Sequence, residues 1–219
     1  GADYTLQLYR GSATHEYAAA QPAPASVTSA GHLQGPGGVE TGVTFAAFGD
    51  YGSGSSNEAA VSTMVKSWNP DFIVAVGDHN YTNNVSVGAP AWTNVIGNFY
   101  GDYILGRQDN FYPEQRSATQ RFFTVPGNHD TGPNSANGGE LSGYFDYFYS
   151  NPGGTPRLPA GVFEPMLTYY KMNWGNMEFY FIDSDNGVTN AAAATAQRQW
   201  MRAQLDAATA RRKFAVWHH

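Results

Sequence analysis

The clearest hydrophobic pattern in the chain is the apolar run at residues 72–76, which lies between Pro70 and Gly77 and is followed directly by Asp78. An unbroken apolar run of this length is typical of a strand that is buried on both faces, in a parallel or mixed sheet. An ionised carboxylate at the end of such a strand is costly unless a partner compensates its charge. Because ligands bind at the carboxyl ends of strands in open α/β sheets, Asp78 predicts a binding site there.

A strand over residues 43–48 ends in the same way, at Asp50. A helix is predicted between the two strands, and Ser55 and Glu58 have the spacing of a capping box at its start. Its apolar residues recur on one helical face: Val61, Met64, Val65 and Trp68. Strand, helix and strand in this order form a βαβ unit with parallel strands. Asp50 and Asp78 should therefore lie at the same edge of one sheet.

The rest of the pattern predicts an α/β domain over residues 43–219. Further strands are expected at 121–125, 167–172, 177–182 and 214–217, a helix at 191–210, possible short helices within 82–121, and a proline-rich loop at 150–165. Residues 1–42 show little pattern apart from a short strand at 5–9. Within this stretch, residues 18–42 are rich in Ala, Pro, Gly, Ser and Thr, and this composition predicts an N-terminal arm or linker at residues 1–42.

Composition narrows the possible partners. The formal net charge of −6 argues against nucleic acid and anionic membranes, which select basic surfaces. No apolar run is long enough to span a bilayer. The chain has no cysteine, which excludes disulfides, thiolate zinc sites and cysteine nucleophiles. Few lysines and many Tyr, Asn, Gly and Thr residues favour a secreted or periplasmic protein.

Oxygen and nitrogen donors follow each of several predicted strands. They are Asp50, Asp78, the run Asn128-His129-Asp130, and the terminal pair His218-His219. Carboxylates gathered at one sheet edge repel each other, so a cation is expected among them. Asp, Asn and His donors without thiolate suit Mn, Fe, Zn or Mg. Pairs of such metals, about 3.5–4 Å apart, recur in enzymes that hydrolyse phosphate esters.

Each motif also has a simpler interpretation. An Asp between a strand and a Gly is often a turn residue, as is a Gly-Asn-His-Asp run. Two terminal histidines are what a clipped purification tag leaves. The loop Gly52-Ser-Gly-Ser55 precedes a helix and could bind phosphate, but it lacks the P-loop pattern and is interpreted as a flexible turn. Because these motifs occur together at the ends of successive strands, we favour a metal site over the simpler interpretations.

Taken together, Asp50-x-Gly52, Gly77-Asp78-x-x-Tyr81, Gly127-Asn-His-Asp130 and a strand ending in His218 resemble the calcineurin-like metallophosphoesterase family over residues 43–219. The tyrosine at position 81 makes the chain most similar to the purple acid phosphatase branch. The resemblance implies a four-layer sandwich of two mixed β-sheets flanked by helices, with a dinuclear metal site at the strand ends.

The resemblance also implies a role for each matching residue. Asp50 and Tyr81 would bind a ferric ion, Asp78 would bridge both metals, and Asn128 and His218 would bind a divalent partner (Fe, Zn or Mn). His218 is preferred to His219 as the ligand. His129 would contact the substrate phosphate and stabilise the transition state, and Asp130 would orient His129.

One motif of the family, Gly-His-x-His, has no match in this sequence. It would supply one histidine to each metal. The expectation is that the polypeptide is cut or incomplete, and that a C-terminal fragment of the same protein completes the site.

The expected function is metal-dependent hydrolysis of small phosphate monoesters by a water that the two metals activate. Two alternatives stay open. The same scaffold could act on phosphodiesters or nucleotides, or the chain could be a catalytically silent binding protein that keeps the fold.

Overall fold

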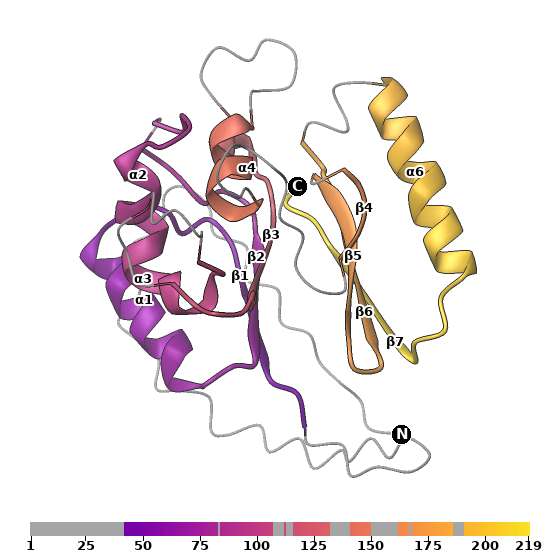
Figure 1. Cartoon of the computed structure of the whole chain (residues 1–219), viewed down its shortest axis with the longest axis horizontal. Coiled ribbons are helices and arrows are strands. Elements are labelled where there is room, and N and C mark those ends of the chain that lie inside the picture. Colours follow the sequence, from indigo (N-terminus) through magenta and orange to yellow (C-terminus); the bar gives the residue numbers. More distant parts are fainter. Residues whose placement is uncertain are drawn as a thin grey trace.

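The computed structural model describes residues 42–82, 84–106, 112, 116–131, 141–149, 162–166, 168–185 and 191–219 (Figure 1). The predicted arm at 1–42, with its strand at 5–9, thus lies almost wholly outside the described residues. The strands are β1 (Phe45–Phe48), β2 (Phe72–Val76), β3 (Phe122–Val125), β4 (Val162–Met166), β5 (Tyr169–Trp174), β6 (Met177–Phe181) and β7 (Arg212–Val216). The helical segments are α1 (Ser56–Ser67), α2 (Pro90–Trp92), η1 (Thr93–Gly97), α3 (Asn98–Tyr100), η2 (Gly101–Tyr103), η3 (Asn128–Asp130), α4 (Ser142–Tyr149) and α6 (Ala191–Asp206).

The strands form two sheets. In the part of the chain that the structure describes, the first is three-stranded in the order β1-β2-β3 and both of its pairs are parallel, so the expected mixed character is seen there in the second sheet alone. The second is four-stranded in the order β4-β5-β6-β7, with two antiparallel pairs and a parallel pair between β6 and β7. The α/β class, with two sheets and flanking helices, is therefore confirmed. The βαβ unit of β1, α1 and β2 is also confirmed.

The two sheets pack face to face through aromatic side chains. Phe45 on β1 contacts Phe179 and Phe214 edge-on, with ring centroids 5.3 and 5.6 Å apart. Phe72 on β2 packs on Trp174 at 4.5 Å. Such aromatic pairs stabilise a core beyond the area they bury. Helices α1 and α3 lie on the far side of the first sheet and α6 lies beside the second, so both sheets are held between helices (Figure 1).

Most strand boundaries differ from the sequence expectation by one or two residues, and two elements differ by more. Residues 162–166 form β4 although they lie at the end of the stretch predicted as loop. Proline is tolerated here because β4 is an edge strand, and its register with β5 shifts between Phe163 and Met166, on either side of Pro165. Helix α6 ends at Asp206 rather than at residue 210, and the basic residues Arg212 and Lys213 already belong to β7. None of the helices in the described ranges is long and apolar enough to cross a membrane.

A buried polar network closes the free edge of β3. The hydroxyl of Tyr170, on β5 of the other sheet, accepts a hydrogen bond from the backbone N–H of Thr124 and donates one to its carbonyl, each at 2.9 Å. The Thr124 hydroxyl bonds to Tyr144 and Tyr149 on α4, at 2.5 and 2.8 Å. The Tyr170 phenol thus satisfies the buried N–H of Thr124 and makes the shorter of two hydrogen bonds to its carbonyl, which also accepts one from Tyr149 at 3.5 Å.

Replacing Tyr170 with Phe should lower the free energy of unfolding by about 1–3 kcal/mol, the usual cost of leaving buried polar groups unpaired. Urea unfolding of the variant measures this loss. The control is Tyr169→Phe, whose ring packs on Trp200 instead. Equal stability of the two variants would show that the phenol does not support the β3 edge.

Candidate metal centre

The loops after β1 and β2 lie against each other at the carboxyl edge of the first sheet. Asp50 and Asp78 both adopt the left-handed backbone conformation, with φ of 56° and 55°. Asp is among the few residues that reach this region readily, and strained backbone of this kind clusters at functional sites. The Asp50 N–H donates to the Gly77 carbonyl (3.1 Å) and the Tyr81 N–H to the Gly52 carbonyl (2.8 Å). The predicted proximity of the two carboxylates follows from this pairing.

Tyr81 connects the two carboxylates. Its hydroxyl lies 3.1 Å from Oδ1 of Asp50 and 2.8 Å from Oδ2 of Asp78. Burial, and next the Asp78 carboxylate, raise the pKa of Tyr81 above its usual value. The phenol therefore keeps its proton in the metal-free site. A bound cation would have to displace that proton before Tyr81 could act as a ligand.

His218 brings the second sheet to the same place, because it follows β7. Its Nδ1 lies 2.7 Å from the Val76 carbonyl, and its Nε2 lies 3.4 Å from Oδ1 of Asp78. A proton on Nδ1 leaves Nε2 directed at the carboxylate, which is how a histidine ligand is usually fixed by its outer hydrogen bond. His219 is exposed and lies near Asp185 instead, at 4.0 Å. The geometry thus distinguishes His218 from its neighbour.

The pKa values of Asp78 and His218 are shifted in opposite directions. Burial acts to raise the pKa of Asp78, but hydrogen bonds from His218, from the His129 N–H and from Tyr81 outweigh it and lower the pKa to about 2. Burial acts to lower the pKa of His218, but Asp78 outweighs it and raises the pKa to about 9. These shifts favour an ionised Asp78 and a protonated His218 at neutral pH when no cation lies between them. Metal binding would release the proton of His218, so affinity should fall as the pH is lowered.

Asp130 joins two of the motif loops. It is fully buried, and its carboxylate accepts the N–H of His79 and the N–H of Gly127, both at 2.8 Å. These bonds hold the loop that carries Asp78 against the loop that carries Asn128 and His129. The described hydrogen bonds of the carboxylate go to backbone, so the role of Asp130 in orienting the His129 ring stays a prediction.

His129 and Asn128 lie at the exposed rim of the cluster, in the turn η3. The His129 ring packs on Tyr81 with centroids 4.4 Å apart, and its backbone N–H donates to Asp78 at 2.9 Å. This turn can approach closely because Gly127 has no side chain, since a Cβ there would lie 2.3 Å from Asp78. The metal role of Asn128 and the substrate role of His129 stay predictions.

Ser184 is a residue that the sequence analysis missed. It lies just after β6, and its hydroxyl accepts the backbone N–H groups of His218 and His219, at 3.2 and 2.9 Å. The hydroxyl thereby fixes the end of β7, from which His218 extends. A lone serine after a strand carries no sequence signal for this role.

Asp50, Asp78 and His218 fit a cation. Each offers one ligand atom, and these atoms lie within 4.8 Å of one another. Two carboxylates and an imidazole are donors that Zn, Mn and Fe accept. Tyr81, which bonds to both carboxylates, is a fourth candidate donor. Four of the five metal ligands expected from the sequence thus lie together.

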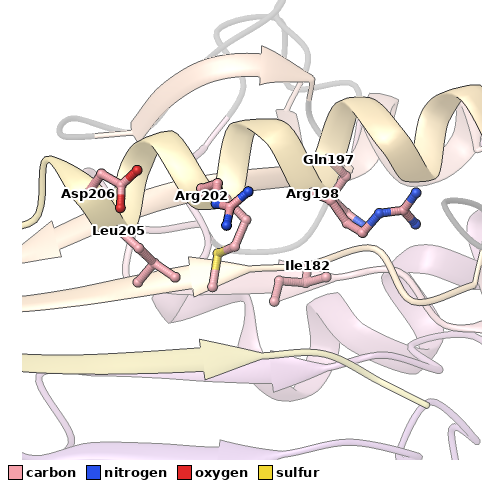
Figure 2. Close-up of a pocket in the computed structure, with 7 residues that line it drawn as sticks. Ile182, Gln197, Arg198, Arg202, Leu205 and Asp206 are labelled. Carbon is pink, nitrogen blue, oxygen red and sulfur yellow. The ribbon is translucent and has the colours of Figure 1, made fainter.

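A pocket elsewhere contains none of these residues. It has a volume of about 440 Å³ and is lined by Ile182 and by side chains of α6, among them Arg198, Met201 and Leu205 (Figure 2). Figure 2 shows Leu205 extending from the helix toward the sheet that carries Ile182. Among the residues that the structure describes, the group that could hold a metal ion lies at the strand ends and not in this pocket, so we place the candidate functional site at the strand ends.

The loop before α1 is not a free phosphate site. Oε2 of Glu58 accepts the N–H groups of Ser53 and Gly54, at 2.9 and 2.6 Å, and so occupies the position that an anion would take. The predicted capping box is only half formed, because Ser55 accepts the Glu58 N–H at 3.4 Å while the Glu58 carboxylate reaches past Ser55. The loop is thus bound by its own helix rather than being a flexible turn.

Comparison with known proteins identifies a family for this chain. The family model for calcineurin-like phosphoesterases matches residues 43–219, which include every strand, helix and site residue described above. A comparison with curated proteins finds no match.

Proposed function

Because the chain belongs to the calcineurin-like phosphoesterase family, we propose that it hydrolyses phosphate monoesters at a dinuclear metal centre built on Asp50, Asp78 and His218. Family membership supports metal-dependent phosphoester hydrolysis in general. The preference for monoesters, an acid phosphatase-like activity and the purple acid phosphatase branch are our proposals. The fold would then be the four-layer sandwich of that family.

The proposal rests on one observation: two carboxylates and one imidazole, each just after a different strand, lie close together. Their ligand atoms lie within 4.8 Å of one another. Asp78 is 3% exposed, so its charge is poorly solvated and needs a partner inside the protein. A site of this kind is costly to a protein that does not use it.

Each residue of the site would have a separate role in metal binding or catalysis. Asp50 and Tyr81 would hold one metal, a ferric ion, since phenolate and carboxylate oxygens are hard donors. Asp78 would bridge to a second, divalent ion held by Asn128 and His218. Metal ions bound here would supply positive charge and lower the pKa of a water that attacks phosphorus. His129, exposed beside Tyr81, would donate hydrogen bonds to the phosphoryl oxygens and a proton to the leaving group.

A rate comparison tests the proposal. The chain is loaded with Fe³⁺ and Zn²⁺, or with Mn²⁺ alone, and assayed on an aryl phosphate monoester and on the matching bis-aryl diester. Hydrolysis of the monoester should be the faster and should stop when a chelator removes the metal. Faster hydrolysis of the diester would favour the phosphodiesterase alternative. Bound metal without hydrolysis of either ester would favour a silent binding protein.

Two further expectations belong to the proposal. A C-terminal fragment bearing Gly-His-x-His would add one histidine to each metal, and a small phosphorylated compound would be the substrate. The composition supports a secreted or periplasmic location. Intact mass of the purified protein, measured under conditions that keep complexes together, checks for the fragment.

A further inference from the structure

Glu58 is a buried acidic residue to which the proposed reaction assigns no role. It lies in the first turn of α1 and is 4% exposed. Its Oε2 accepts hydrogen bonds from the Ser53 N–H at 2.9 Å and the Gly54 N–H at 2.6 Å, and lies 3.4 Å from the Ser53 hydroxyl. The side chain therefore serves as an acceptor for the loop that enters the helix.

That loop also carries Asp50. The Ser53 N–H donates to the Tyr51 carbonyl at 2.7 Å, in addition to its bond with Glu58. The Tyr51 N–H donates to the Asp78 carbonyl at 3.3 Å. Hydrogen bonds thus connect Glu58 to Ser53, Ser53 to Tyr51, and Tyr51, the residue after Asp50, to the carbonyl of Asp78. The loop that carries Asp50 is therefore bound both to Glu58 and to the loop that carries Asp78.

The carboxylate of Glu58 also acts on two buried phenols, since it raises the pKa values of Tyr51 and Tyr100 in addition to the larger effect of their burial. Oε1 and the hydroxyls of Tyr51 and Tyr100 are buried, and none of the three has a hydrogen-bond partner among the described residues. Burial, and next the Glu58 carboxylate, raise the pKa of Tyr100. Burial also raises the pKa of Glu58 to about 8, so that near neutral pH the group is largely a neutral acid. Its effect on the loop then comes from its oxygen rather than from its charge.

We propose that Glu58 is a positioning residue of the metal centre, which holds the loop of residues 50–54 so that Asp50 stays within ligand distance of Asp78 and His218. This inference rests on the proposed function, because it requires that the cluster binds metal. Glu58 itself touches neither metal nor substrate. The neutral isostere Gln should hold the loop as Glu58 does and preserve metal binding, whereas an apolar side chain of the same length should not.

Calorimetric titration with Mn²⁺ compares the wild type with Glu58→Met, Glu58→Gln and Val65→Ala. Glu58→Met leaves the Ser53 and Gly54 N–H groups unpaired and should weaken Mn²⁺ binding about 10- to 100-fold, the range for partners outside the ligand shell. Glu58→Gln should stay within about threefold of the wild type, since one amide oxygen can accept both N–H groups. Val65 is a buried core residue of the same helix, so Val65→Ala should lose stability and keep its Mn²⁺ affinity.

Amide hydrogen exchange in the metal-free proteins gives a second readout. Exchange at Ser53 and Gly54 should speed up in Glu58→Met and not in Glu58→Gln or Val65→Ala. If Glu58→Met does not fold, Glu58→Asp, which withdraws the acceptor by one methylene, should show the same two changes. If Glu58→Met bound Mn²⁺ with the same affinity as the wild type, the inference about Glu58 would be wrong, while the proposed function would still stand. Failure of the wild type to bind Mn²⁺, Zn²⁺ or Fe³⁺ would overturn the proposed function itself.

Discussion

Replacing Asp78 with Asn is expected to weaken metal binding by at least about 100-fold, above the effect of changing residues outside the ligand shell, and to abolish hydrolysis with it. Asp78 is the centre of the cluster: its Oδ1 lies 3.4 Å from His218 and accepts the His129 N–H, and its Oδ2 accepts from Tyr81. Asn keeps the shape and one acceptor oxygen but removes the charge that a cation needs. Calorimetry and elemental analysis measure the loss.

The matched control is Asp71→Asn. Asp71 lies just before the same strand, is exposed, and accepts the Thr44 N–H at 2.8 Å, so the same chemical change is made far from the cluster. This variant should bind metal as the wild type does. If Asp78→Asn retained full affinity, the metal would be bound by other residues.

Replacing Gly52 with Ala is expected to destabilise the protein by about 3 kcal/mol and to disrupt metal binding as well. A Cβ at position 52 would lie 1.6 Å from the His79 carbonyl oxygen and 2.8 Å from the Asn80 nitrogen. These are backbone atoms, which no rotamer change can move aside. The loops after β1 and β2 would have to separate, and Asp50 would move away from Asp78.

Urea unfolding tests this, with Gly42→Ala as the control, since nothing lies within 4 Å of a Cβ at position 42. Gly42→Ala should be as stable as the wild type. Similar stability of the two alanine variants would mean that the two loops are not in contact.

The shared edge of Asp50 and Asp78 follows from the sequence. The hydrophobic pattern predicts a strand, a helix and a second strand, and the two strands of such a βαβ unit run parallel. Their carboxyl ends therefore lie at the same edge of the sheet. The aspartates are then neighbours whatever the details of packing. The pairing of β1 with β2 and the 4.8 Å grouping with His218 agree with this reasoning.

Contacts between distant segments do not follow from the sequence. Tyr170 closing the β3 edge and Ser184 fixing the end of β7 are single residues without a periodic pattern, and each acts on a segment far along the chain. The spacing of Ser55 and Glu58 predicts a capping box, but backbone N–H donors one or two positions apart compete for the same carboxylate. Only the folded loop decides that Ser53 and Gly54 bind it rather than Ser55.

Strand boundaries were hardest to predict where proline occurs. Residues 162–166 contain Pro165 and follow a proline-rich stretch, which favours a loop. They nevertheless pair with β5, because an edge strand needs hydrogen bonds on one side only. Residues 162–166 therefore form a strand because they pair with β5, and their own sequence pattern does not predict it.

The most direct test of the metal centre is a crystal structure of the chain grown with Mn²⁺ or Zn²⁺, with anomalous diffraction data collected at the absorption edge of the metal. We predict an anomalous peak about 2.0–2.3 Å from Asp50, Asp78 and His218, where the hydrogen bond between Tyr81 and the two carboxylates now lies. Bound metal whose peak lies away from these three residues would contradict the account.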